Sequence, residues 1–182
     1  MIQVGIDFNA IKKTLISYIK NPVVAMKNIP HWDWKTLITL QLLTSLISGV
    51  LASLININIW GLLQGIIIIP IVSLVTAGVT SLFLYYSFLF LSQRSLSHKE
   101  LLTIVILSNI PFFFLQTLST HFSPYLSLIG VLCSAFLLIV GLVEHYQLPR
   151  PLVIKVVVSI WFIYLIIWGL GQIESYQLGH RF

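Results

Sequence analysis

The sequence predicts an all-α fold: a polytopic membrane helical bundle with five transmembrane helices and an N-terminal amphipathic interfacial helix. Two observations indicate this. The chain has 182 residues, of which 58% are hydrophobic and only 8% are charged, whereas soluble domains have about 25% charged residues. Charge is absent between Lys35 and Arg94, and again between Glu100 and Glu144. Because hydrocarbon about 30 Å thick takes roughly 20 apolar residues in a helix to cross, these stretches allow repeated crossings.

The N-terminal region, residues 1–35, is expected to be cytoplasmic and interfacial. Apolar residues recur there at helical spacing with lysines on other faces: Phe8, Ile11, Leu15, Tyr18 and Ile19 beside Lys12, Lys13 and Lys20. This pattern is typical of a basic amphipathic helix that lies among lipid headgroups. We therefore interpret the three lysines as contacts to anionic headgroups, each contributing about 1 kcal/mol. Asn21 and Pro22 predict the end of this helix and the start of a second short one.

Five spans follow in residues 36–175, at about 36–55, 59–91, 101–118, 125–143 and 152–173, before a short external tail at 176–182. The second is difficult, because the 33 residues from Ile59 to Leu91 would form a helix of about 50 Å. We favour an elbow at 61–69 followed by a crossing that begins at Pro70. One strongly tilted, kinked helix is the alternative. Ser97 and Glu100 form a capping box that precedes the third span.

Lysine and arginine gather in alternate connections. Nine lie in the N-terminal region and in the links after the second and fourth spans: Lys12, Lys13, Lys20, Lys27, Lys35, Arg94, Lys99, Arg150 and Lys155. The other two connections have none, and the tail has Arg181 alone. The positive-inside rule therefore predicts a cytoplasmic N-terminus and an external C-terminus. Because the net positive charge comes from lysine and arginine beside the membrane spans, we expect no nucleic-acid partner.

Small residues recur at every fourth position on the first two spans. They are Ser45, Gly49 and Ser53 on the first and Ser73, Ala77 and Ser81 on the second, with Gly61/Gly65 and Gly130/Ser134 as further pairs. Such ridges let helices approach closely in lipid. We interpret them as packing faces inside the bundle, and a homo-oligomer face is the alternative.

The third span contains a polar break, Ser108-Asn109-Ile110-Pro111. Pro111 removes one backbone hydrogen bond, and Asn109 is costly against lipid, so it should face the bundle. A structural kink and a site that contacts lipid or solute both remain open. Gln41, Gln64 and Gln116 would be further polar lining, and Pro70 would be a second break.

No pattern in the sequence indicates catalysis or a cofactor. Serine-hydrolase, zinc-protease and phosphate-loop motifs are missing, as is a pair of acidic residues within a span. The five histidines have no metal-type spacing. Glu144 and His145 end the fourth span at an interface, where solvation is cheap, although a proton relay or a partner contact is conceivable.

The order of these features resembles the Yip family, the Ypt/Rab-GTPase-interacting membrane proteins, in its bacterial inner-membrane branch. The similar features are the amphipathic region that reaches Asn21-Pro22, five spans, the serine-then-proline pattern at 107–111, and the Trp-Gly-Leu-Gly segment at 168–171. The resemblance implies a helical, non-enzymatic protein in the bacterial inner membrane. Eukaryotic members bind prenylated GTPases, but their D-L-Y-G-P motif has no match here, so no GTPase-binding residue is assigned.

Two functions are therefore expected from different classes. The first is a non-catalytic integral membrane protein that organises membrane lipid or partner proteins. The alternative is a small permease or lipid scramblase that works as an oligomer, with a route lined by Gln64, Ser108, Asn109 and Gln116. Broken helices and midplane polar groups are common in transporters.

Replacing Lys12, Lys13 and Lys20 with Glu should weaken the contact of the N-terminal helix with anionic lipid, because attraction becomes repulsion. Lipid-dependent protection of this segment measures the effect. Unchanged protection would contradict the interfacial interpretation.

Overall fold

The computed structural model describes residues 8–54 and 59–179, with side chains from 11 to 54 and from 59 to 170. Within these ranges the chain is helical and has no strand, so the predicted all-α fold is confirmed. Five helical stretches are long and apolar enough to cross a membrane: Trp34–Ser53, Ile59–Ser92, His98–Ser119, Tyr125–Tyr146 and Arg150–Leu170. The connection between the first two spans, for which the sequence predicts a short uncharged turn at 56–58, and the chain ends at 1–7 and 180–182 lie outside the described residues.

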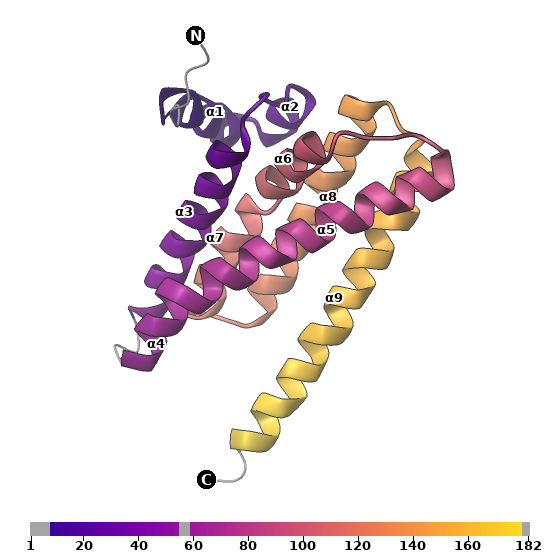
Figure 1. The fold of residues 1–182 in the computed structure, drawn as a ribbon. Coiled ribbons are helices and arrows are strands. Elements are labelled where there is room, and N and C mark those ends of the chain that lie inside the picture. The colour runs from indigo at the N-terminus through magenta and orange to yellow at the C-terminus, as the bar shows by residue number, and fades with distance from the viewer. Residues whose placement is uncertain (1–7, 55–58, 180–182) are drawn as a thin grey trace.

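The helices follow one another along the chain in a bundle that two short helices cross at one end (Figure 1). The elements are α1 (Phe8–Lys20), α2 (Pro22–Lys27), α3 (Trp34–Ser53), α4 (Ile59–Leu63), the π-helix η1 (Gln64–Ile68), α5 (Ile69–Ser92), α6 (His98–Ser108), α7 (Ile110–Ser119), α8 (Tyr125–Tyr146) and α9 (Arg150–Gly179). The last helix thus continues past the expected end of the fifth span at residue 173.

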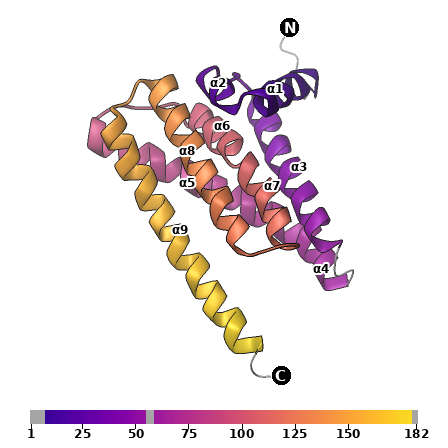
Figure 2. The same ribbon diagram turned by 180° about the vertical axis from the view of Figure 1, so that it is seen from behind.

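The two ends of the bundle differ in the connections they hold. Helices α1 and α2 lie at the same end as the links at 93–97 and 147–149, and the C-terminus of α9 lies at the other end, as Figures 1 and 2 show. The links with basic residues therefore share one end, as the predicted topology requires. Which side of a membrane this end faces stays a prediction.

Side-chain caps begin three of the helices. Asn21 Oδ1 accepts the Val24 amide at 3.1 Å, with proline in the first turn of α2. Asp33 Oδ1 accepts the Thr36 amide at 3.1 Å at the start of α3, and these hydrogen bonds from Thr36 hold the pKa of Asp33 below its usual value. Ser97 Oγ accepts the Glu100 amide at 3.5 Å before α6. These caps satisfy amide groups that have no partner in the first helical turn.

The second span is one continuous helical path with a wide turn inside it. The Ile69 amide donates to the Gln64 carbonyl, five residues back, in η1. Pro70 follows directly, and proline cannot donate to the carbonyl four residues earlier. A π-turn beside a proline widens the helix and relieves this crowding. The bend therefore begins at 64–68, before Pro70, and the whole of Ile59–Ser92 has the length and hydropathy of a span.

Helix α6 is the centre of the bundle. All eight residues from Leu101 to Ser108 are buried, because α2, α3, α5 and α8 surround this helix. Met26 of α2 is fully buried, and a Cβ atom at Gly141 of α8 would lie 2.7 Å from the Met26 Cε atom. The short helix α2 is therefore packed into the bundle and does not merely rest on it.

The backbones of α3 and η1 touch at two glycines. A Cβ atom at Gly49 would lie 2.9 Å from the Gly65 Cα atom, and one at Gly65 would lie 2.5 Å from the Gly49 carbonyl oxygen. Real Cβ atoms do not approach backbone atoms this closely. Ser45 and Ser53, one helical turn to either side of Gly49, are also buried. This contact fixes where the first span crosses the second.

Gly49→Ala should lower stability by about 1–3 kcal/mol, because the new methyl group must push two backbones apart. Gly78→Ala is the matched control, since its Cβ atom would meet nothing within 4 Å. In that open position the change removes a helix-interior glycine and should be neutral or stabilising by up to about 1 kcal/mol. Thermal unfolding in one detergent compares the two variants, and equal melting temperatures would contradict the crossing.

Candidate functional site: a cavity between the spans

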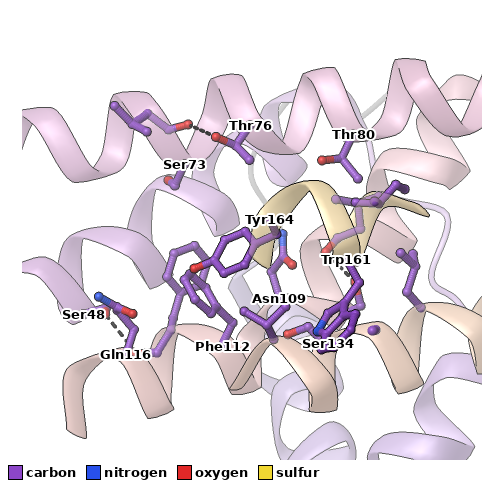
Figure 3. Close-up of a pocket in the computed structure, with 18 of the residues that line it drawn as sticks. Ser48, Ser73, Thr76, Thr80, Asn109, Phe112, Gln116, Ser134, Trp161 and Tyr164 are labelled. Carbon is purple, nitrogen blue, oxygen red and sulfur yellow. Dashed lines mark hydrogen bonds between the residues drawn. The ribbon is translucent and has the colours of Figure 1, made fainter. Parts of the chain in front are cut away.

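The bundle encloses a cavity of about 470 Å³ to which all five spans contribute. Its apolar wall includes Val105, Phe112, Phe113, Val131, Leu138, Val157 and Ile160. Its polar side chains are Ser48, Ser73, Thr76, Thr80, Ser108, Asn109, Gln116, Thr120, Ser134, Trp161 and Tyr164. Figure 3 shows how they lie around one space between α5, α7, α8 and α9. A volume of about 300–1,000 Å³ is common for ligand sites.

The interruption of the third span supplies one side of the cavity. Helix α6 ends at Ser108, Asn109 stands between the helices, and α7 begins at Ile110 with Pro111 in its first turn. Ser108, Phe112, Gln116 and Thr120 recur at intervals of four residues, and all four line the cavity. These residues form a stripe that is polar except at Phe112. Helix α7, which holds the middle of the stripe, runs from the middle of the bundle toward the end opposite α1 (Figure 1).

Several hydroxyl groups in the cavity are satisfied by a backbone carbonyl of their own helix. Ser73 Oγ donates to the Pro70 carbonyl at 2.9 Å, Thr76 Oγ1 to Val72 at 2.8 Å, and Ser108 Oγ to Val105 at 2.9 Å. This arrangement is usual for serine and threonine inside helices. These three side chains therefore make the wall polar without requiring a ligand.

Two polar atoms in the cavity wall are fully buried and have no hydrogen-bond partner among the described residues. These atoms are Ser134 Oγ and Trp161 Nε1. The other atoms of this kind in the described chain are Tyr18 Oη and Gln41 Oε1, and neither residue lines the cavity. Burial raises the pKa of Tyr18 above its usual range. The unpaired atoms of α8 and α9 thus meet at the same cavity.

The cavity is partly open, and several of the residues that line it are exposed at the surface of the bundle. The lining residues Ile68 and Val72 are 52% and 55% exposed, and Thr76 is also exposed. Helices α5 and α9 diverge from one end of the bundle to the other in both views (Figures 1 and 2). Among the described lining residues none is Lys, Arg, His, Asp or Glu. The cavity is therefore amphipathic, uncharged and open at an apolar flank.

The residues expected from the sequence are divided between different places. Ser108, Asn109 and Gln116 come together in the cavity, whereas Gln64 is exposed on η1 outside it. Pro70 is buried and lines a separate apolar groove between α3 and the start of α5.

Several of the expected residues join neighbouring helices. Gln41 is fully buried, and its Nε2 atom donates to the Ser73 carbonyl at 3.3 Å, which links α3 to α5. Ala77 and Ser81 are buried on α5, while Ser73 is partly buried and lines the cavity. Ser73 thus belongs to a small-residue ridge and to the cavity wall.

Sequence reasoning did not predict that Ser48, Ser134, Trp161 and Tyr164 line the cavity. It also did not predict a hydroxyl stripe on α5, formed by Ser73, Thr76 and Thr80. One pattern could have indicated the stripe, since Ser73, Thr76 and Thr80 are three and four residues apart and share a helical face. Trp161 and Tyr164 are three residues apart and also share a helical face. Their convergence with Ser134 depends on how α8 meets α9, which local spacing does not determine.

The N-terminal segment is joined to the bundle by ionisable side chains. Lys27 Nζ lies 3.2 Å from Glu144, and Glu100 lies 3.5 Å from His31 and 3.6 Å from His145. Partly exposed pairs of this kind contribute little stability. Lys12, Lys13 and Lys20 of α1 are exposed. Within the described residues, no group of three His, Cys, Asp or Glu side chains could hold a metal ion.

Comparison of the chain with protein-family models, with curated proteins and with solved structures finds no match.

Ser48→Ala should lower the stability of the bundle by about 0.6 kcal/mol, the average for a hydrogen bond between helices in lipid. The upper limit for such a bond is about 2 kcal/mol. Ser48 Oγ donates to the Phe113 carbonyl at 2.9 Å and lies 2.8 Å from Thr117 Oγ1, so the variant loses a link between α3 and α7. The control is Ser159→Ala, because the exposed Ser159 hydroxyl donates to Lys155 of its own helix. An equal loss of thermal stability in both variants would contradict the link.

Proposed function

We propose that the protein is a non-catalytic integral membrane protein that organises membrane lipid by holding a lipid molecule in the cavity. One observation supports this most directly: the cavity is lined by apolar side chains with a stripe of hydroxyl and amide groups, and it is partly open at a surface formed by apolar helices. An acyl chain would fit the apolar wall, and the polar part of a lipid would fit the stripe. Ligand sites commonly combine an apolar lining with a few polar groups in this way.

The position of the cavity supports a role in one half of the bilayer. Its polar stripe ends at Thr120, the residue that follows α7, and α7 ends at the side of the bundle opposite α1 and α2 (Figure 1). Toward α1 and α2, the cavity reaches Val105 of α6, and the residues from Leu101 to Ile104 beyond it are buried and do not line the cavity. With a cytoplasmic N-terminus, as the basic links predict, the ligand would come from the outer leaflet of a bacterial inner membrane.

The proposal also includes the binding partners of the bundle and its relation to the Yip family. Only 17% of the spanning window of α5, and the same share of α9, is buried, so lipid, a membrane-protein partner or a second copy would cover these faces. The exposed lysines of α1 would contact anionic headgroups. Membership of the Yip family is proposed from the order of the sequence features alone.

A small permease or lipid scramblase is the second candidate, and the polar stripe favours it. A transport route must reach both ends of the bundle, however, and here the stripe stops where α6 is surrounded. Transport would therefore need a second conformation in which α6 separates from its neighbours. Scrambling of labelled lipid in vesicles that contain the purified protein would favour this candidate over lipid holding.

Val131→Trp should reduce the amount of lipid that the protein retains, because Val131 lines the cavity and the indole ring would occupy part of its volume. Leu132→Trp is the matched control: it is the next residue of α8, is 51% exposed and lies outside the lining. Mass spectrometry of the lipids extracted with each variant in native nanodiscs measures retention relative to the bulk membrane.

The expected result is loss of one enriched lipid class in Val131→Trp and wild-type retention in Leu132→Trp. Identical lipid profiles for both variants and wild type would contradict lipid holding in the cavity.

A further inference from the structure

The two unpaired polar atoms of the cavity wall define what its ligand must provide. Trp161 Nε1 can only donate a hydrogen bond, and a serine hydroxyl can donate one as well. A buried donor without a partner is costly, which makes such atoms rare in folded proteins. Both atoms are buried at the same cavity and lack a partner in the described chain. An acceptor atom on a bound molecule would satisfy them.

Ser134 differs in its hydrogen bonding from Ser45, Ser73 and Ser108, which are other serines of the spanning helices. Ser45, Ser73 and Ser108 donate to carbonyls of their own helices at 2.7–2.9 Å. Ser134 is only 7% exposed and makes no such bond within the described residues. Its hydroxyl is therefore a buried donor without a partner in the described chain, on a residue that lines the cavity.

The absence of charge limits the class of ligand. No Lys, Arg or His is present among the described lining residues, so a phosphate group would enter a low-dielectric space without a counter-charge. Burial of an unpaired charge is far more costly than burial of a neutral polar group. Aromatic and branched aliphatic side chains, among them Phe112, Val131 and Ile160, leave room for a hydrocarbon chain beside the donors.

We propose that Trp161 and Ser134 form a subsite that binds the carbonyl oxygen of an uncharged lipid. This assignment rests on the proposed lipid-holding function and adds the ligand class: a neutral lipid with a carbonyl acceptor. Diacylglycerol and an isoprenoid quinone share this chemistry. The donors of α8 and α9 recognise the carbonyl, and the apolar wall takes the chain (Figure 3).

The test is native mass spectrometry of the purified protein in detergent with four short-chain probes. These are dioctanoylglycerol, its dioctyl ether analogue without carbonyls, dioctanoyl phosphatidic acid and a short-chain quinone. Wild type should bind dioctanoylglycerol, the quinone or both more tightly than the ether and the phosphatidic acid. Trp161→Phe and Ser134→Ala should each weaken carbonyl-lipid binding by about three- to tenfold, the usual effect of one hydrogen bond, and leave ether binding unchanged.

Controls separate recognition from folding. Trp60→Phe changes a 77% exposed tryptophan outside the cavity and should bind like wild type, and thermal unfolding shows that each variant is folded. If wild type binds dioctanoylglycerol but neither donor variant weakens it, or if phosphatidic acid binds equally well, the subsite is overturned while lipid holding stands. If wild type binds none of the probes and Val131→Trp retains lipid like wild type, lipid holding itself fails.

Discussion

Complete burial of α6 is the constraint on which the arrangement of the bundle depends. Backbone polar groups in hydrocarbon must be satisfied within their own helix, and apolar association in lipid comes from close packing rather than from exclusion of water. Helix α6 meets the second requirement on every side, because its residues from Leu101 to Ser108 contact neighbours all around. The close fit ends at Asn109, where Pro111 interrupts the helix. The cavity extends from Val105 and Ser108, in the last turn of α6, along α7, so the packed part of α6 and the open space adjoin each other.

The direction of α5 follows from a second contact. Gly49 and Gly65 bring two backbones together at the start of the second span, and the wide turn of η1 changes the path of the helix directly after it. Helix α5 then crosses the bundle at a steep tilt while α9 packs chiefly on α8 (Figures 1 and 2). Two helices that share one end and diverge toward the other leave a space that side chains of ordinary size do not fill. The cavity is therefore a consequence of two local features, the glycine contact and the proline-adjacent turn.

The sequence predicts those parts of this structure that depend on local chemistry. Asn21, Ser97 and the uncharged stretches determine helix starts and spans without reference to distant residues, and the five membrane-length helices follow from them. The sequence predicts an elbow at 61–69 but not the π-turn at Gln64–Ile68 that forms it, because several local geometries relieve a proline in a helix. Gln64 and Gln116 look equivalent in the sequence, yet only Gln116 faces the cavity. Their difference depends on the rotation of each helix against its neighbours, which the packing of Gly49 and of α6 decides.

Polar groups within the spans fall into two classes, and the distinction bears on how such a cavity can be selective. Hydroxyls bonded to their own helix, such as those of Ser73 and Thr76, are already satisfied and discriminate weakly between ligands. A donor held without a partner discriminates strongly, because a ligand without an acceptor leaves it unpaired in the bound state. In an uncharged cavity this is the main source of specificity, since apolar walls accept hydrocarbon chains of many kinds. In the proposed function, the two donors on α8 and α9 that are unpaired in the described chain would therefore determine which lipid is held, while the rest of the wall would determine only that the ligand is a lipid.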